Sequence, residues 1–359
     1  MEGVVMPLQT AFWRTKRVLL TGHTGFKGSW LALWLQRLGA QVTGLALAPA
    51  TSPNLCDAAD IAQGMRSHLC DVRDAQAVAA QVRAAQPQIV FHLAAQALVR
   101  ASYADPLATY ATNVMGTAHV LEALRGLDGV QVAVMVTTDK VYCNLEHPYP
   151  YREHDSLGGH DPYSASKAAS EIVIASYRDA FLASQGVAVA SARAGNVIGG
   201  GDWSCDRLIP DAVRAWQAGQ TLVIRSPLAI RPWQHVIEPL AGYLQLAQTL
   251  WDQPQLAGAY NFGPHTHAAA TVKYVVEMAR NTYGSGIASY EKNSNDNNLH
   301  EAHLLTLETA KVRAVLGIEP CWTLAQTVGR CMAWYRAQND GANARDLCLA
   351  DLGAFEVKP

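Results

Sequence analysis

The first half of the chain alternates short apolar runs with longer stretches in which apolar and polar residues follow a helical period. The apolar runs predict strands at Arg17–Thr21, Gln41–Ala48, Ser67–Asp71, Gln88–Leu93, Val132–Thr137 and Val187–Arg193. The stretches between them predict helices at Ser29–Leu38, Asp74–Gln86, Pro106–Arg125 and Tyr163–Leu182. Strands separated by helices of this length are joined by right-handed crossovers. The pattern therefore predicts an α/β fold with a doubly wound parallel sheet, a Rossmann architecture.

The regular alternation fades after Ala194, where a glycine-rich loop and short polar segments follow. We expect this half to form a smaller mixed α/β lobe at the carboxyl edge of the sheet, where open α/β sheets bind ligands. His235–Leu250, as a strand and a helix, and the strand Ala259–Phe262 are expected to rejoin the sheet. The predicted domains are 12–195 plus about 230–263 for dinucleotide binding, and 196–229 plus about 264–350 for the second lobe.

A glycine-rich turn follows the first predicted strand and precedes an amphipathic helix. Its three glycines suit a tight turn, a close approach of the backbone to pyrophosphate, and close packing of helix on strand. The phosphates would lie at the positive N-terminus of the helix. This turn predicts a dinucleotide cofactor held by Gly22, Thr24, Gly25, Phe26, Lys27 and Gly28.

Two further strand ends are expected to contact the cofactor. Asp71, followed by Val72, can accept a hydrogen bond from an adenine amino group or cap a helix. The fourth strand ends in small residues that leave room for the cofactor, and its candidates are Leu93, Ala94, Ala95 and Gln96. The second strand ends without the acid that binds the ribose of NAD. NAD is the expected cofactor and NADP an alternative, which Lys27 would favour unless it is simply solvated.

Tyr163 and Lys167 stand one helical turn apart on the same face of a predicted helix. Asp161 can cap that helix, and Pro162 suits its first position. A lysine ammonium beside a phenol stabilises the phenolate, so we expect Lys167 to lower the pKa of Tyr163. Such a phenol can take a proton from a sugar hydroxyl while hydride leaves for a nicotinamide. The alternative is an ordinary surface pair on an amphipathic helix.

Thr138, Asp139 and Lys140 follow the fifth predicted strand, so their side chains reach the edge of the expected cleft. Thr138 would hydrogen-bond a substrate oxygen near Tyr163. The adjacent Asp139 and Lys140 supply an acid and a cation at the strand end where chemistry occurs in such folds. A surface salt pair is the alternative interpretation.

The composition of the chain argues against several classes of protein. The 359 residues are 50% hydrophobic and 16% charged, with a net charge of −2, which argues against a nucleic-acid-binding protein. Seven cysteines without a CxxC pair indicate reduced thiols rather than a disulfide framework or zinc site, and no metal site is expected. No apolar run reaches the roughly 18 residues of a membrane helix. No signal peptide is expected either, so the cytoplasm is the predicted location.

The glycine turn, Thr138-Asp139-Lys140, the Tyr163/Lys167 pair and Arg193-Ala-Gly-Asn196 together resemble the extended short-chain dehydrogenase/reductase family. Within it, Gly195–Trp203 and Arg231–His235 are similar to stretches of the nucleotide-sugar 4,6-dehydratases. The resemblance extends from about Phe12 to about Trp334. It implies NAD as cofactor, CDP-glucose as small-molecule substrate, and a homodimer or dimer of dimers built on the helices at Pro106–Arg125 and Tyr163–Leu182.

The resemblance also implies a reaction. Tyr163 deprotonates the C4 hydroxyl as hydride leaves C4, a base removes the C5 proton, Asp139 protonates the departing C6 hydroxyl, and hydride returns to C6. Related dTDP-glucose enzymes have a Glu where this chain has Lys140. Lys140 is therefore either a neutral base or a cation that stabilises the enolate, with water or Tyr163 as the base.

In the second lobe, Asn196 is expected to contact the sugar diphosphate, and Arg231 can bind the pyrophosphate through its planar fork. Further candidates, each with a structural alternative, are Arg207, Trp233, His235 and Glu301. Three rivals stay open. They are a nucleotide-sugar 4-epimerase or decarboxylase on the same scaffold, a dehydratase of a dTDP- or GDP-sugar, and a cofactor-binding regulator without catalysis.

Overall fold

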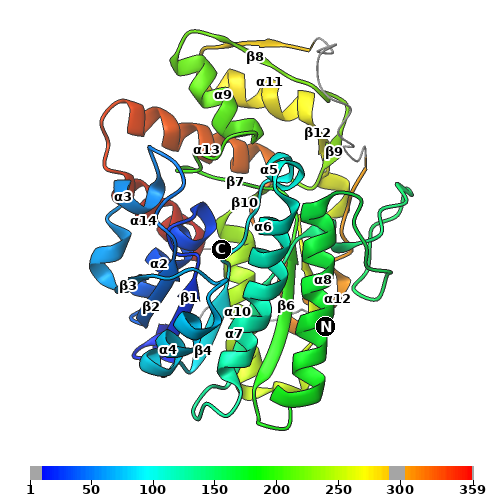
Figure 1. The fold of residues 1–359 in the computed structure, drawn as a ribbon. Helices are drawn as coiled ribbons and strands as arrows, with labels where there is room; N and C mark the ends of the chain where they lie inside the picture. Colours follow the sequence, from blue (N-terminus) through cyan, green and yellow to red (C-terminus); the bar gives the residue numbers. More distant parts are fainter. Residues whose placement is uncertain (1–9, 291–303, 358–359) are drawn as a thin grey trace.

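A seven-stranded parallel sheet forms the centre of the computed structural model, which describes residues 10–290 and 304–357 (Figure 1). Its strands, in spatial order, are β11 (Ala259–Phe262), β6 (Ala188–Ala194), β5 (Val132–Val136), β4 (Ile89–His92), β1 (Arg17–Thr21), β2 (Gln41–Ala46) and β3 (Arg66–Leu69). Every neighbouring pair is parallel. The predicted fold class is confirmed, and β1 has the predicted bounds.

Helices cover both faces of the sheet. One face carries α2 (Phe26–Arg37), α10 (Ile237–Asp252) and α14 (Ala344–Glu356), and the other carries α4 (Ala75–Ala85), α7 (Gly116–Leu124) and α8 (Pro162–Tyr177). Each strand supplies both faces in alternation, as Val132 and Val134 enter one buried cluster while Ala133 and Met135 enter the other. Burial on both sides explains why the strands read as continuous apolar runs.

Two predicted long helices contain a wide turn that the sequence pattern did not predict. The first runs from α6 (Pro106–Tyr110) through the π-helical η2 (Ala111–Met115) into α7. The second runs from α8 into the π-helical η4 (Arg178–Leu182). Both predicted caps are present: Asp74 accepts from the first turn of α4, and Asp161 accepts from Ser164.

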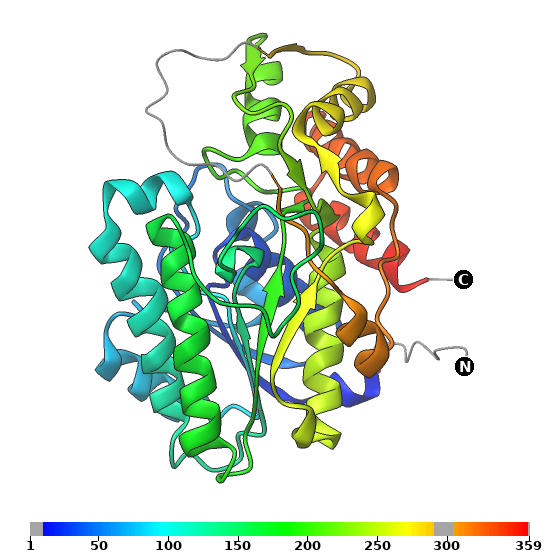
Figure 2. The ribbon, with the colours of Figure 1, turned by 90° about the vertical axis from the view of Figure 1, so that its right-hand side faces the viewer.

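The second lobe lies above the carboxyl ends of the strands (Figures 1 and 2). It contains α9 (Leu208–Gln217), α11 (Val272–Tyr283) and α13 (Leu324–Asn339). Its short strands form three pairs: β7 (Val197–Ile198) with β10 (Gln234–His235), β8 (Thr221–Val223) with β13 (Ile287–Ser289), and β9 (Ile230–Arg231) with β12 (Ala270–Thr271). The remaining short helices of the described chain, outside as well as inside this lobe, are α1 (Thr10–Trp13), α3 (Leu55–Ala58), η1 (Ile61–Gly64), α5 (Val99–Ala104), η3 (Asp139–Val141), η5 (Pro254–Leu256), η6 (Thr266–Ala268) and α12 (Ala310–Leu316).

One expectation for this region is wrong. The strand at His235 does not rejoin the main sheet but pairs with β7, because β11 occupies the edge position beside β6. The helix that follows, α10, covers the face of the sheet instead, and β11 joins the sheet as predicted.

Within the described ranges, no helix is long and apolar enough to cross a membrane. All seven cysteines lie in the described part of the chain, and each is a free thiol. No group of three or more metal-binding side chains occurs among residues 10–290 and 304–357.

Candidate active site

The start of α8 holds Tyr163 and Lys167 at the centre of the molecule. Asp161 caps this helix by accepting from the backbone N–H of Ser164 at 2.9 Å and from its hydroxyl at 2.6 Å. The backbone N–H of Tyr163 donates to the hydroxyl of Ser102 at 3.1 Å. Tyr163 is 9% exposed and Lys167 4% exposed, so both functional groups lie in a largely dry environment.

The end of β5 brings a second set of groups to the same place. Thr138 begins the short turn η3, and its hydroxyl donates to Oδ1 of Asp139 at 2.9 Å. The ammonium of Lys140 lies 3.2 Å from the same oxygen. The other oxygen, Oδ2, is buried and has no hydrogen-bond partner among the described residues. It faces Gly195, at which a Cβ atom would lie 3.4 Å from it. This oxygen therefore has the capacity for a further hydrogen bond.

The predicted lowering of the Tyr163 pKa is wrong. Burial raises the pKa of Tyr163 to about 12, against a hydrogen bond with Thr138 and the charge of Arg207, while the charge of Asp139 adds to the increase. The Lys167 ammonium donates to the carbonyl of Val136 at 2.9 Å. Burial also lowers the pKa of Lys167 to about 8, against the charge of Glu171. The physical reason is that removing the phenol from water outweighs the hydrogen bond with Thr138 and the positive charge of Arg207.

The glycine turn has the shape that a dinucleotide pyrophosphate requires. Gly22 has a φ of +78°, and a Cβ atom there would lie 2.7 Å from the backbone nitrogen of Ala94. At Gly28 a Cβ atom would lie 2.0 Å from the carbonyl oxygen of Gly22, so only glycine allows this contact. Gly25 precedes α2 without a side-chain cap, which leaves the first-turn N–H groups facing a possible phosphate. Thr24 braces the turn by donating to the carbonyl of Leu47 at 2.9 Å.

The end of β4 is fixed by side chains from its neighbours. The backbone N–H groups of Leu93 and Ala94 both donate to the hydroxyl of Thr21 at 3.1 Å, which orients this strand end towards the glycine turn. The amide of Gln96 is used internally, since it donates to the carbonyl of Leu98 and the hydroxyl of Thr109. Ala95, between Ala94 and Gln96 in the chain, has no polar side chain.

Asn113 joins this strand end to α8. Its side-chain nitrogen donates to the carbonyl of Gln96 at 3.0 Å and to the hydroxyl of Ser166 at 2.8 Å. Gly116, in the same helix, has a similar role, because a Cβ atom there would lie 2.7 Å from Val72.

Asp71 already has a partner. Its carboxylate accepts three hydrogen bonds from the Arg73 guanidinium, at 3.0, 2.9 and 2.6 Å, and one from the Arg73 backbone N–H at 2.9 Å, which lowers the pKa of Asp71. An adenine amino group at this position would share the carboxylate with Arg73.

Lys27 is not a solvated surface lysine. Its ammonium lies 5.9 Å from the centre of the Tyr243 ring, inside the site. Burial, together with the charges of Arg207, Lys167 and Lys140, lowers the pKa of Lys27 to about 7, while Asp139 opposes the change. The sequence could not indicate this position, because the cations that surround Lys27 come from three other segments.

The second lobe contributes three polar candidates to the cleft. Oδ1 of Asn196 is buried and has no hydrogen-bond partner in the described part of the chain. Arg207 pairs with Asp202 at 3.0 Å, and its charge reaches Tyr163. Arg231 is 6% exposed and donates to the carbonyl of Ile230 at 2.9 Å.

Two other candidates lie in packed surroundings. His235 is fully buried, with its ring against Trp30 and Trp322 at centroid distances of 6.0 and 4.8 Å. The indole nitrogen of Trp233 donates to the carbonyl of Ala270 at 3.1 Å. These contacts favour the structural alternative for both residues. Glu301 lies outside the described residues.

Sequence reasoning did not identify Glu171 and Arg193 as site residues. They form a buried ion pair behind Lys167, with side chains 3% and 4% exposed. The available signal was the spacing, since Glu171 follows Lys167 by one helical turn on a buried helix face.

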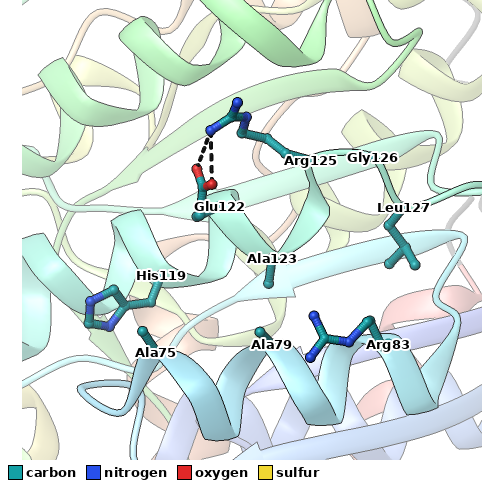
Figure 3. Close-up of a pocket in the computed structure, with 9 residues that line it drawn as sticks. All are labelled: Ala75, Ala79, Arg83, His119, Glu122, Ala123, Arg125, Gly126 and Leu127. Carbon is teal, nitrogen blue, oxygen red and sulfur yellow. Dashed lines mark hydrogen bonds and ion pairs between the residues drawn. The ribbon is translucent and has the colours of Figure 1, made fainter.

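A surface hollow between α4 and α7 has no part in this site (Figure 3). It is lined by residues such as Ala79, His119 and Glu122, and Glu122 accepts from Arg125 at 2.8 Å. None of the expected site residues lines it.

Comparisons with known proteins agree with this geometry. A family model described as GDP-mannose 4,6 dehydratase matches residues 19–331. The chain is 46% identical over 332 residues to CDP-glucose 4,6-dehydratase of Salmonella typhimurium, covering 91% of this chain and 92% of the relative. It is 30% identical over 327 residues to dTDP-glucose 4,6-dehydratase of Streptomyces griseus, covering 89% of this chain and 94% of the relative.

Solved structures share the fold. One is UDP-glucose-4-epimerase from Stenotrophomonas maltophila with bound NAD and formylated UDP-arabinopyranose, at a TM-score of 0.77 and 22% identity, covering 90% of this chain and 99% of that one. Another is dTDP-glucose 4,6-dehydratase from Bacillus anthracis in complex with NAD, at a TM-score of 0.75 and 21% identity, covering 90% and 97%.

Proposed function

Because this chain belongs to the GDP-mannose 4,6-dehydratase family, we propose that it is an NAD-dependent CDP-glucose 4,6-dehydratase. It converts CDP-glucose into CDP-4-keto-6-deoxyglucose and water. The observation that carries the reaction type is the unpaired, buried Oδ2 of Asp139 beside Thr138 and Tyr163. The choice of CDP-glucose rests on the 46% identity to an enzyme of that name.

NAD fits the residues present. A backbone cradle at Gly22 and Gly28 that excludes any side chain, followed by the uncapped start of α2, suits a pyrophosphate. When bound, NAD supplies a hydride acceptor that later gives the same hydride back, so the reaction involves no net oxidation.

Tyr163 is the proposed base for the C4 hydroxyl. Its phenol must lose a proton although burial raises its pKa to about 12. The charge of Arg207 and the hydrogen bond with Thr138 oppose this increase and stabilise the phenolate. Lys167, one turn further along the same helix face, is proposed to add to this effect. Thr138, hydrogen-bonded to Tyr163 and Asp139, holds the sugar oxygen between them.

Asp139 is the proposed acid for the elimination of water. Once C4 is a ketone, the C5 proton becomes acidic and is taken by a water molecule, and the C6 hydroxyl leaves as water when a protonated Asp139 delivers the proton on Oδ2. Hydride then returns to C6 and a proton to C5. Thr138 and Lys140 both bond Oδ1 of Asp139, at 2.9 and 3.2 Å, which leaves Oδ2 as the oxygen that holds the proton. The contact with Asp139 favours a charged Lys140 that stabilises the enolate over a neutral lysine base.

Recognition of the diphosphate is assigned to Arg207, Arg231 and Asn196 from the second lobe. The guanidinium groups offer paired donors to phosphate oxygens. The buried Oδ1 of Asn196 can accept from a sugar hydroxyl.

We also propose a cytoplasmic homodimer. The helices α6, η2 and α8 lie along one outer side of the molecule (Figure 1) and expose large apolar side chains, with Leu107 80%, Met115 50% and Ile172 62% exposed. Such a concentration is typical of an interface between copies. Leu107→Glu with Ile172→Glu should give monomers by light scattering. An unchanged mass would contradict this interface, and a dimer or a dimer of dimers would then form through another surface.

The decisive assay incubates the purified protein with CDP-, dTDP- and GDP-linked hexoses and measures product mass. Loss of one water from CDP-glucose alone supports the proposal. Water loss from another nucleotide sugar instead would show that this sugar, and not CDP-glucose, is the substrate. An unchanged mass with inversion at C4 in the NMR spectrum of the product, even with NAD and NADP supplied, would favour a 4-epimerase. That rival has no use for the acid at Asp139, and the epimerase structures share only the fold.

A further inference from the structure

A buried ion pair lies directly behind the candidate active site. Glu171 stands on α8 one turn after Lys167, and Arg193 stands on the adjacent strand β6. Nη2 of Arg193 donates to Oε2 of Glu171 at 2.8 Å. Taking two charges out of water is costly, so a pair this deeply buried is retained only with further hydrogen bonds or a function.

The Glu171 carboxylate is fully occupied by neighbours from β5 and β6. Its Oε1 accepts from the hydroxyl of Thr137 at 2.5 Å, and its Oε2 also accepts from the hydroxyl of Ser191 at 2.7 Å. Through Thr137, the helix that carries Lys167 is bonded to the end of the strand that leads into Thr138.

Arg193 makes contacts at the other end of the turn η3, which carries Asp139. Its Nη1 donates to the hydroxyl of Tyr142 at 2.9 Å and to the carbonyl of Glu153 at 3.0 Å. The Tyr142 hydroxyl donates in turn to Oδ1 of Asn261 at 2.6 Å, which fixes its direction.

Thr137 and Tyr142 bracket the turn η3. Thr137 immediately precedes Thr138, and Tyr142 immediately follows Val141. The two members of the ion pair therefore hold the two ends of the segment that carries Thr138, Asp139 and Lys140. They do so from the helix and the strand against which this segment packs.

We propose that Glu171 and Arg193 are positioning residues, which fix the Asp139 turn against the Tyr163 helix and place the Glu171 carboxylate one helical turn from Lys167. Neither residue needs to touch substrate. The kinetic consequences of this inference rest on the proposed function, whereas the charge of Lys167 does not.

Besides Arg193 on β6, which pairs with Glu171 at 2.8 Å, the groups around Lys167 come from four elements. Glu171 lies on its own helix and is the negative group that opposes the effect of burial. His92 from β4 is neutral at ordinary pH, because burial lowers its pKa to about 3. The charges of Lys27, at the start of α2, and Lys167 repel each other, and the carbonyl of Val136 in β5 accepts from the ammonium. A lysine with a pKa of about 8 is charged below that pH and loses its proton above it.

The charge is tested on Lys167 itself, by ¹³C NMR of ε-labelled lysine, with Lys167→Met identifying the signal. Glu171→Gln should lower the pKa of Lys167 by roughly one unit or more, as expected for loss of an opposite charge at close range. Glu171→Asp keeps the negative charge, so the pKa of Lys167 in this variant should stay close to the wild-type value. Asp179→Asn, which removes an exposed acid following the same helix, is the matched control and should leave the titration unchanged.

The positioning role is tested with variants that keep volume and charge. Thr137→Val and Tyr142→Phe each remove one hydroxyl at one end of the turn, and each should lower kcat about tenfold or more while KM stays within about twofold. The high-pH limb of the pH dependence of kcat should not move in these two variants. Glu171→Gln should lower kcat and also move that limb to lower pH.

Several results would overturn the inference. A folded Glu171→Gln protein with an unmoved Lys167 titration would refute the charge role. Wild-type kcat in both Thr137→Val and Tyr142→Phe would refute the positioning role, even if Glu171→Gln fails to fold. If no nucleotide sugar is converted, the proposed function fails, but the NMR titration still decides the part about Lys167.

Discussion

The two sides of the cleft hold their charged groups differently. On the sheet side, Glu171 and Arg193 are 3% and 4% exposed, with a direct contact at 2.8 Å. On the lobe side, Asp206 lies 3.6 Å from Arg100 and 3.9 Å from Arg225, and all three side chains are 38–41% exposed. The reaction chemistry needs fixed distances, which buried bonds provide. The half-exposed ion pairs around Asp206 are screened by water and hold their partners less firmly.

The largest effect is expected on the sheet side, at Tyr163. Tyr163→Phe removes the proposed base and keeps the ring, so kcat should fall about a thousandfold or more while the melting temperature changes little. Steady-state kinetics and thermal unfolding of the same preparation check this. Retention of wild-type kcat would refute catalysis by Tyr163 and revive the idea of a regulator.

Asp139→Asn should come next. The amide cannot deliver a proton, so water loss should fall about a hundredfold or more. Oxidation at C4 does not need this acid, so cofactor reduction, seen as absorbance of the reduced nicotinamide in a single turnover, should persist. Glu122→Gln, a surface acid paired with Arg125, is the control and should behave as wild type. Normal dehydration by Asp139→Asn would refute the assignment of the acid.

A smaller effect is expected on the lobe side. Arg207→Gln removes a charge proposed to bind the diphosphate, and a charge-assisted hydrogen bond contributes ~1.5–3 kcal/mol, so KM for CDP-glucose should rise about tenfold or more. Its charge also helps to lower the Tyr163 pKa, so a lesser decrease in kcat should accompany this rise. Arg83→Gln on the surface hollow serves as control. If KM is unchanged, Arg207 does not bind the substrate.

The smallest effect is expected at Asp206. Asp206→Asn breaks two long, half-exposed ion pairs, which together should contribute less than about 1 kcal/mol to the free energy of unfolding. Denaturant titration measures this, and the difference should shrink further at high salt. A larger loss would contradict the contrast between the two sides of the cleft.

The alternation of apolar runs with helical stretches was sufficient to predict the sheet, because its strands are buried on both faces and therefore read as apolar throughout. The glycine turn and the caps at Asp74 and Asp161 were predictable for a similar reason, since each depends on a few adjacent residues. The π turns at η2 and η4 carry no such local signature.

The electrostatics were not predictable in the same way. The Tyr163 pKa moves up rather than down because burial depends on every element that covers the phenol. Lys27 was compatible with a solvated side chain until the fold surrounded it with cations from other segments. Likewise, the β10 strand could be predicted from the sequence, but not its partner β7.

The sequence by itself therefore determined the parallel sheet, the cofactor turn and the identity of the Thr138, Asp139, Tyr163 and Lys167 set. These features depend on local backbone preferences and on spacing along one helix or strand. Only the tertiary structure decided which of these groups meet, in which direction the pKa values of Tyr163 and Lys167 shift, and that the Glu171–Arg193 ion pair lies behind them. The physical reason is that distance and desolvation are properties of packed elements, and residues far apart in the chain supply them.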